Sequence, residues 1–168
     1  MSFPKIPRVP ACLVTLLICT VAAAGPGRQV AITIDDLPRG GDGGPYELTA
    51  MRAMTQKLLT PFREQKLPVI GFVNAGRNPG DPTLLREILD LWLDAGAELG
   101  NHSYSHLDIN DVPLTAYTAD IAAGEPAISA ALAARGKKLE FYRHPYLHTG
   151  PTAAIKKDLQ GFLDSQGY

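Results

Sequence analysis

Hydrophobic residues fall along the chain in two alternating patterns, short continuous runs and longer stretches with helical spacing. The short runs, which are typical of buried strands, are residues 30–34, 68–73, 97–100 and 139–142. The stretches with helical spacing follow them at residues 46–65, 81–96, 113–134 and 151–165. A regular alternation of strand and helix predicts an α/β fold in which parallel strands are joined by right-handed helical crossovers.

The second of these helices has the clearest signals. Asp81 and Pro82 form an N-cap and first-turn signal, and Gly96 ends the helix. Trp92 lies on its apolar face among leucine and isoleucine residues, so we assign this indole to the core.

Two other helices contain residues that disfavour helical structure. Pro61 should shorten or kink the first helix, because proline lacks the backbone N–H and clashes with the preceding turn. Gly124 and Pro126 should interrupt the third helix for related reasons.

The N-terminal segment has the pattern of a secretory signal peptide. Lys5 and Arg8 precede an apolar stretch that ends in small residues at Ala24. This stretch is shorter than the ~20 apolar residues of a membrane span. We therefore expect residues 1–24 to be removed, leaving residues 25–168 as an exported domain, periplasmic or secreted, with no stable membrane insertion.

Composition and charge narrow the function classes further. The chain of 168 residues is 45% hydrophobic and 20% charged, as expected for one globular domain. Loss of Lys5 and Arg8 changes the formal net charge from −1 to −3, which indicates no nucleic-acid or membrane-surface partner. No oligomeric state is predicted.

Both cysteines, Cys12 and Cys19, lie within the removed segment. No disulfide is then available to the mature domain, despite an oxidising destination. Lipid attachment at Cys19 is a less favoured alternative, because the bulky Ile18 stands where a small residue is expected.

Candidate chemistry is concentrated in three places. The four histidines occur as two pairs with equal spacing, His102 with His106 and His144 with His148, and an acidic pair, Asp35 and Asp36, follows the first predicted strand. Carboxylate and imidazole groups are the usual oxygen and nitrogen ligands of divalent metals. Together these residues favour a metal site.

The predicted parallel strands would bring these residues together although they are far apart in the sequence. Asp36, Asn74, His102 and Arg143 each follow closely on a predicted strand. Parallel strands bring their carboxyl ends to one rim, where reactive groups gather in such folds. We expect the acidic pair and the first histidine pair to converge there.

The second histidine pair has a different setting. Pro145 follows His144 directly and argues against a helical turn that would place both histidines on one face. We therefore assign His144 and His148 to a loop or to substrate contact, and a second metal site is the less favoured alternative.

Each assignment has a structural alternative. The acidic pair could cap a helix or form an Asx turn, and the first histidine pair could be a chance spacing on a loop. Arg143 could form an ordinary surface ion pair. Asn74 and Asn101 could contact substrate or form turns, and the tyrosines beside the site could pack or stack on a sugar: Tyr104, Tyr142 and Tyr146.

Three motifs in order resemble a known family. Residues 33–38 read TIDDLP, residues 102–106 read HSYSH and residues 143–146 read RHPY. In this order and spacing they resemble the polysaccharide deacetylases, also called the NodB-homology domain or carbohydrate esterase family four. The resemblance covers roughly residues 29–168.

The resemblance implies a fold and a ligand set. The fold would be a distorted (β/α) barrel with fewer strands than the full eight. Asp36, His102 and His106 would bind a divalent metal, zinc in the first place, with cobalt, nickel or manganese as alternatives. The sequence alone leaves Asp35 open as a further ligand. Three protein ligands leave coordination positions open, as a catalytic metal requires.

The resemblance also implies an activity. Asp35 would be the general base, Arg143 would orient that carboxylate, and the backbone N–H of Tyr146 would help to hold the oxyanion. The reaction would remove N- or O-linked acetyl groups from a carbohydrate. A non-catalytic carbohydrate-binding relative and a metal-dependent hydrolase of non-sugar amides are the alternatives.

The sequence departs from the family pattern at three places. Ile34 replaces the usual phenylalanine of the first motif, and Leu37 replaces the glycine that commonly follows the acidic pair. The family normally continues with an aspartate-tryptophan motif and a leucine-histidine motif whose histidine is the general acid. Both would lie beyond Tyr168, so we expect the sequence to be truncated within the barrel.

Overall fold

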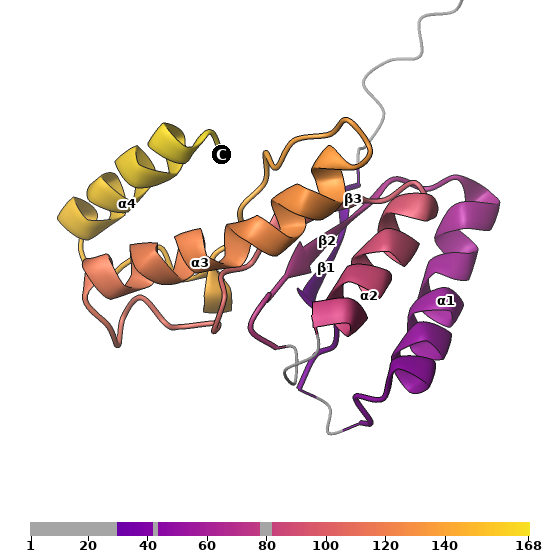
Figure 1. Ribbon diagram of the computed structural model, residues 1–168. Coiled ribbons are helices and arrows are strands. Elements are labelled where there is room, and N and C mark those ends of the chain that lie inside the picture. The colour runs from indigo at the N-terminus through magenta and orange to yellow at the C-terminus, as the bar shows by residue number, and fades with distance from the viewer. Residues whose placement is uncertain (1–29, 42–43, 78–81) are drawn as a thin grey trace, which may run out of the picture. The chain divides into compact units, whose positions relative to one another are not determined.

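The computed structural model describes residues 30–41, 44–77 and 82–168 (Figure 1). All of the described helices and strands lie in one compact unit, Ala31–Tyr168. The predicted signal peptide and the predicted N-cap at Asp81 lie outside the described residues. None of the described helices is both long enough and apolar enough to cross a bilayer.

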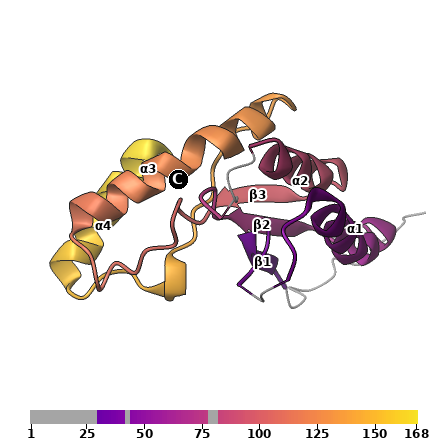
Figure 2. The same ribbon diagram turned by 60° about the horizontal axis from the view of Figure 1, so that its bottom comes forward.

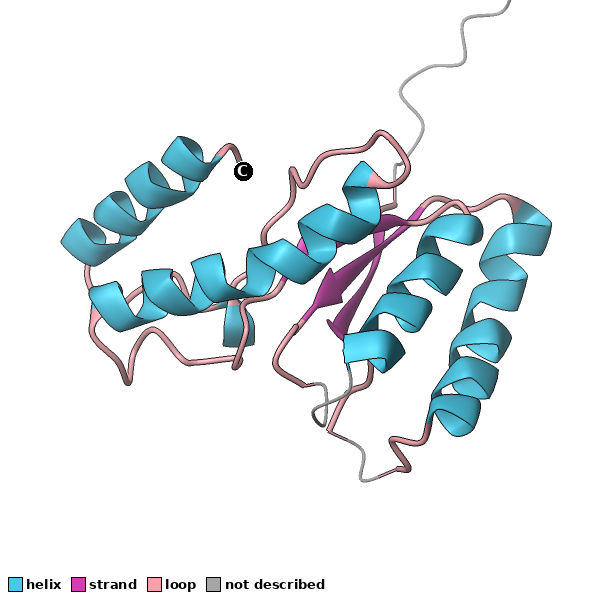
Figure 3. Ribbon diagram, in the orientation of Figure 1, coloured by secondary structure: helices cyan, strands magenta, loops and turns pink. Residues whose placement is uncertain are grey.

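Three parallel strands form the sheet, in the order β1 (Ile32–Leu37), β2 (Val69–Val73) and β3 (Glu98–Asn101). Figure 3 shows them in magenta with helices on the sheet. The predicted parallel arrangement of these strands is confirmed. The first strand differs from its prediction, because it begins later and continues through the acidic pair.

The fourth predicted strand, residues 139–142, is wrong. Within this segment only Tyr142 pairs with the sheet, through a single parallel bridge to Asn101. Asn101 is the last residue of β3, so the two segments meet only where β3 ends and no ladder extends between them. The described residues therefore form a three-stranded sheet, without the further strands that would close a barrel.

The four predicted helices are present as α1 (Leu48–Gln65), α2 (Pro82–Asp94), α3 (Leu114–Ala133) and α4 (Ala153–Gln166). A short 3-10 helix, η1 (Pro145–Leu147), occupies the loop of the second histidine pair. In Figure 2, α1 and α2 lie side by side and α4 lies along α3, in agreement with their contacts.

Neither proline ends its helix, so the predicted shortening at Pro61 and the predicted interruption at Pro126 are wrong. Pro61 lies inside the last turns of α1, and Pro126 lies inside α3, without ending either helix. Both prolines are exposed, so the ring projects into water and the carbonyl that loses its partner can be solvated. Gly124 is also helical, and it has a packing role described below.

Two hydrophobic clusters support the unit. The larger cluster packs the sheet against α1, α2 and the C-terminal half of α3, with Trp92 almost completely buried, as predicted. The smaller cluster joins α3, α4 and the loop before α3 through Ile109, Tyr117, Ile121, Leu159 and Leu163. The residues that follow β1, β2 and β3 thus stand on a packed base, at the rim where parallel strands end.

Candidate metal centre

A bulge in β1 determines where the acidic pair points. Ile34 pairs with Gly71 and Leu37 pairs with Val73, so β1 advances three residues while β2 advances two. Asp35 and Asp36 both lie within this irregularity, and Asp36 has a φ of 63°, a left-handed conformation that aspartate tolerates better than most residues. Because of the bulge, the two neighbouring carboxylates do not simply alternate between opposite faces of the sheet.

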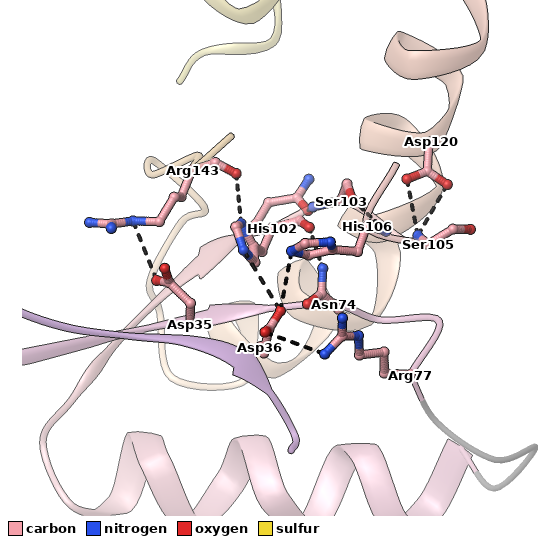
Figure 4. A network of polar contacts seen from close by, with 11 residues as sticks. Asp35, Asp36, Asn74, Arg77, His102, Ser103, Ser105, His106, Asp120 and Arg143 are labelled. Carbon is pink, nitrogen blue, oxygen red and sulfur yellow. Dashed lines mark hydrogen bonds and ion pairs between the residues drawn. The ribbon is translucent and has the colours of Figure 1, made fainter. Parts of the chain in front are cut away.

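The structure brings Asp36, His102 and His106 together (Figure 4). Asp36 Oδ1 lies 3.4 Å from His106 Nε2 and 3.8 Å from His102 Nε2, and the candidate ligand atoms all lie within 4.8 Å of one another. Ligands bonded to one tetrahedral zinc ion lie about 3.4 Å apart. The cluster therefore needs only small shifts to surround one ion.

The Asp36 carboxylate independently tests whether the cluster suits a cation. Its Oδ1 atom is buried and has no hydrogen-bond partner among the described residues, although it faces two imidazole nitrogens. A buried carboxylate oxygen without a partner is costly. A cation held between this oxygen and the two Nε2 atoms would satisfy it.

The hydrogen bond of the second His102 ring nitrogen determines which nitrogen of the ring carries the proton. Nδ1 lies 2.8 Å from the backbone carbonyl of Arg143, which can only accept a hydrogen bond. The proton therefore lies on Nδ1, and the Nε2 lone pair faces the cluster. Burial lowers the pKa of His102, and this also favours the neutral, ligating form.

The loop that carries His106 is held by hydrogen bonds from the chain around it. The His106 backbone N–H donates to Ser103 Oγ at 3.0 Å, and the Ser103 N–H donates to Asn101 Oδ1 at 2.8 Å. The Ser105 N–H donates to both carboxylate oxygens of the buried Asp120 on α3. These bonds fix a backbone that has positive φ at both Ser103 and His106.

Neither Asp120 nor the packing role of Gly124 was predicted from the sequence. An acidic residue on the buried face of α3, one position before Ile121, was the available signal for Asp120. A Cβ atom on Gly124 would lie 2.7 Å from Asn101 Oδ1 and 3.0 Å from the Ser103 carbonyl carbon. Glycine is therefore required where α3 packs against residues 102–106, which carry both histidines of the cluster and are called the ligand loop below.

Asn74 and Asn101 are fully buried and bonded within the protein. Asn74 Nδ2 donates to the His102 carbonyl, which ties the end of β2 to the ligand loop. Asn101 Nδ2 donates to the Ile121 carbonyl at 3.0 Å and to Tyr168 Oη at 2.7 Å. In this structure both asparagines support the backbone of the site.

Asp35 and Arg143 form a pair beside the cluster. Arg143 Nε lies 3.4 Å from Asp35 Oδ1, and its guanidinium group stacks 4.7 Å from the centre of the buried Phe72 ring. Stacking limits the guanidinium to few orientations, so the ion pair has a defined geometry. Asp35 is more exposed than Asp36 and is not part of the three-residue ligand cluster.

Arg77 forms an ion pair with Asp36 that was not predicted from the sequence. Its Nη1 atom lies 3.3 Å from Asp36 Oδ2, the carboxylate oxygen that does not face the histidines. Its only signal in the sequence is a basic residue in the loop after β2. The ion pair holds the carboxylate with Oδ1 turned toward His102 and His106 (Figure 4).

The tyrosines near the site differ in their surroundings. The Tyr146 ring is 59% exposed and stands edge-on to His106 with ring centres 4.6 Å apart. The Tyr142 hydroxyl donates to Tyr117 Oη, and burial raises the pKa of Tyr117 to about 12. Tyr142 therefore packs, whereas Tyr146 and the exposed Tyr104 offer ring surface to solvent.

The second histidine pair does not come together as a metal site. The His144 ring packs against Tyr142, and burial lowers the pKa of His144. His148 instead faces Asp108, with 2.9 Å from Nδ1 to each carboxylate oxygen. Within the described part of the chain, the only group of three or more potential metal ligands is Asp36, His102 and His106.

Comparisons with known proteins agree with these motifs and this fold. The sequence model of the polysaccharide deacetylase family matches residues 22–160. A search of curated proteins gave no match. Among solved structures, the chain is similar to a family 4 carbohydrate esterase from Streptomyces lividans in complex with acetate, with 25% identity and a TM-score of 0.57 over 82% of this chain and 58% of that one.

Two further structures share the fold. The peptidoglycan deacetylase PdaC from Bacillus subtilis is 24% identical, with a TM-score of 0.55 over 77% of this chain and 54% of that one. A family 4 pseudoenzyme from Bacillus anthracis is 17% identical, with a TM-score of 0.55 over 79% and 40% of the two chains.

The chain therefore spans little more than half the length of the first two relatives and less than half that of the pseudoenzyme. The family match nevertheless covers most of the sequence, from before β1 into α4. It includes both motifs of the ligand cluster and the segment that carries Arg143 and Tyr146. The chain belongs to the polysaccharide deacetylase family.

Proposed function

We propose that this chain is a metal-dependent hydrolase that removes N- or O-linked acetyl groups from a carbohydrate. The observation that carries the proposal is the Asp36 Oδ1 atom, which is buried without a hydrogen-bond partner and faces the Nε2 atoms of His102 and His106. A divalent cation is the partner that these three atoms suit.

Asp36, His102 and His106 would hold the metal. One carboxylate and two imidazoles suit zinc first, and cobalt, nickel and manganese are also compatible with this ligand set. Three protein ligands leave room for water and substrate. When bound, the metal would polarise the acetyl carbonyl and lower the pKa of a water molecule.

Asp35 would be the general base that takes a proton from the attacking water. Its carboxylate lies beside the ligand cluster, paired with Arg143, rather than within it. The planar guanidinium would orient the Asp35 carboxylate, while stacking on Phe72 keeps the guanidinium in place. This division gives the two adjacent aspartates different tasks, ligand and base.

Tyr146 would contribute through its backbone. A preorganised N–H group gains most when negative charge develops on the carbonyl oxygen. The Tyr146 ring stands against His106, so this residue lies next to the ligand cluster. Its φ of 55° shows that the chain turns sharply there.

The family and the N-terminal segment support the proposed substrate and location. The relatives are described as carbohydrate esterases and peptidoglycan deacetylases, which supports an acetylated carbohydrate as substrate. The apolar segment before Ala24 supports export to the periplasm or beyond the cell. We propose that the three-stranded sheet is part of the family's distorted (β/α) barrel.

A non-catalytic carbohydrate-binding protein is the second candidate. It is favoured by the pseudoenzyme among proteins with this fold. Both candidates bind metal through Asp36, His102 and His106, but only the hydrolase releases acetate. Activity on small amides, with none on acetylated sugars, would instead indicate a hydrolase of non-sugar amides.

Two variants test the proposal. We expect His102→Ala to abolish zinc uptake, because it removes a ligand, and we expect Asp35→Asn to retain zinc. Asp35→Asn should lower acetate release from acetylated oligosaccharides by at least about 100-fold, since the base is lost. Metal analysis and an acetate assay on the same preparations provide both readouts. Equal loss of metal in the two variants would contradict the division of roles between Asp35 and Asp36.

A further inference from the structure

Each aspartate of the acidic pair has its own arginine partner. Arg143 pairs with Asp35, and Arg77 pairs with Asp36, with 3.3 Å between Arg77 Nη1 and Asp36 Oδ2. The proposed function gives Arg143 a task, the orientation of the base, and gives none to Arg77. The Arg77 and Asp36 side chains are only 28% and 30% exposed, so their ion pair is more sheltered than an ordinary surface pair.

The contact with Arg77 distinguishes the two oxygens of the Asp36 carboxylate. Oδ1 lies 3.4 Å from His106 Nε2 and 3.8 Å from His102 Nε2. Oδ2 lies against the guanidinium, and Figure 4 shows this contact on the side of the carboxylate away from the two histidines. One oxygen is therefore directed at the candidate metal position, and the other is held by a cation of the protein itself.

The Asp36 side chain does not itself determine whether one or both of its oxygens bind an ion. Rotation about its Cβ–Cγ bond has broad minima, because this bond joins an sp³ atom to an sp² atom. Carboxylates accordingly bind metal ions through one oxygen or through both. A contact from outside the side chain therefore sets the choice, and Arg77 makes such a contact with Oδ2.

The backbone beside Arg77 is tied to the ligand loop. The Gly76 N–H donates to the Tyr104 carbonyl at 2.9 Å. A Cβ atom on Gly76 would lie 2.6 Å from that carbonyl oxygen, so the close approach of the two loops requires glycine. The Arg77 N–H in turn donates to the Asn74 carbonyl at 3.1 Å. The guanidinium and the histidines of the cluster thus extend from two loops that are bonded to each other.

We propose that Arg77 is a positioning residue that holds Asp36 Oδ2 away from the metal, so that Asp36 binds the ion through Oδ1 alone. A guanidinium suits this task because it is permanently charged and forms strong hydrogen bonds with carboxylates. With one oxygen from Asp36, the ion has three protein ligand atoms and keeps more positions for water and for the acetyl oxygen. This inference rests on the proposed function through its metal site.

The coordination of the metal tests this role directly. In Arg77→Met, Oδ2 loses its partner and can turn toward the ion. We expect crystals of the zinc-loaded variant to show both Asp36 oxygens bonded to zinc, whereas wild type shows a bond of about 2.0–2.2 Å from Oδ1 alone. In solution, the visible absorption of the cobalt-loaded variant should be about twofold or more below that of wild type, because Co(II) absorbs more weakly as its coordination number rises.

Zinc affinity and turnover separate this role from a merely structural one. The zinc affinity of Arg77→Met should stay within about threefold of wild type or increase, because the freed oxygen adds a bond, whereas loss of a residue that only supports a ligand lowers affinity. The kcat on acetylated oligosaccharides should fall by about 10- to 100-fold, since Oδ2 takes a position that water or substrate needs.

Two further variants make the test specific. Arg77→Lys keeps a positive charge and an N–H donor for Oδ2, so it should retain most of the wild-type cobalt absorption. Arg86→Met is the matched control, because it removes an arginine from another arginine–aspartate pair, in which Arg86 Nε lies 2.9 Å from Asp90 Oδ2 on α2. It should leave the zinc affinity, the cobalt spectrum and the rate unchanged.

The outcomes separate this inference from the proposed function. If Asp36 binds zinc through both oxygens in wild type, or through one oxygen in Arg77→Met, Arg77 does not control the carboxylate, and the proposed function stands as long as wild type releases acetate. If zinc-loaded wild type releases no acetate from acetylated oligosaccharides, the proposed hydrolase fails, while the zinc and cobalt measurements still decide the role of Arg77.

Discussion

The two histidine pairs have the same spacing and different outcomes. His102 and His106 converge on Asp36, whereas His144 packs against a tyrosine and His148 pairs with Asp108. The difference lies in the backbone. Both loops contain two residues with positive φ, Ser103 and His106 in the first and Tyr146 and Leu147 in the second, but only the second pair flanks a 3-10 turn that begins with proline.

The two loops also differ in how firmly the rest of the protein holds them. Three buried side chains form hydrogen bonds with the first loop: Asn74, Asn101 and Asp120. The second loop exposes Tyr146 and Leu147 to solvent. Equal spacing in sequence therefore does not make an equal site, because a ligand pair also needs a third donor and a backbone that holds it.

The largest difference is expected in zinc affinity, between a variant that lacks one histidine of the first pair and a variant that lacks one histidine of the second pair. We expect His106→Ala to lower zinc affinity by at least about 100-fold, since even outer partners of ligands contribute about 10- to 100-fold. His148→Ala should leave zinc affinity within about twofold. Competition titration with a chromogenic chelator measures both. A similar loss for the two variants would mean that the second pair also holds the metal.

A smaller difference is expected in the free energy of unfolding, between a glycine of α3 that packs against the ligand loop and a glycine of α4 with no neighbour at its Cβ position. Gly124→Ala places a Cβ atom 2.7 Å from Asn101 Oδ1 and should lower the free energy of unfolding by about 1–3 kcal/mol. Gly161→Ala in α4 is the matched control, because nothing lies within 4 Å of its Cβ position. It should stabilise the protein by up to about 1 kcal/mol.

Urea unfolding of the metal-free proteins gives both values. Zinc affinity should also fall in Gly124→Ala and not in Gly161→Ala, because only the first change moves the backbone around Ser103. If both glycines tolerate alanine equally, α3 does not constrain the ligand loop.

The smallest effect concerns pH and the second loop. Burial lowers the pKa of His144 in the folded protein, so below its ordinary value near 6.5 the unfolded chain binds a proton that the folded chain does not. His144 therefore contributes stability above that pH, and this contribution is lost as the pH falls toward the folded pKa. His144→Gln should reduce the loss of stability of the metal-free protein between pH 7.5 and pH 5. An unchanged difference between these two pH values would show that His144 does not contribute to it.

The sequence predicted much of the fold, because most of its signals are local. Three of the four strand runs and all four helices are present near the expected residues, and the core position of Trp92 is confirmed. The fourth strand failed because strand formation depends on a partner, and residues 139–142 meet β3 only at its end. Pro61 and Pro126 do not end their helices, because the exposed side of a helix tolerates them.

The sequence pointed to the residues of the candidate site but not to its geometry. Spacing and strand ends indicated that the acidic pair and the first histidine pair would meet, and the resemblance to the deacetylase family singled out Asp36, His102 and His106 as ligands. The bulge that turns Asp36 toward the histidines depends on the register between two strands, which no local pattern encodes. Arg77 and Asp120 act through contacts across the fold, so their sequence signals were too weak to distinguish them from ordinary charged residues.

The central claim is that one divalent ion binds between Asp36, His102 and His106. Crystals of the zinc-loaded protein, measured on both sides of the zinc absorption edge, test it most directly. We expect one strong anomalous peak about 2.0–2.2 Å from Asp36 Oδ1 and from both Nε2 atoms. A peak bonded to other side chains, with Asp36 still paired only to Arg77, would contradict it.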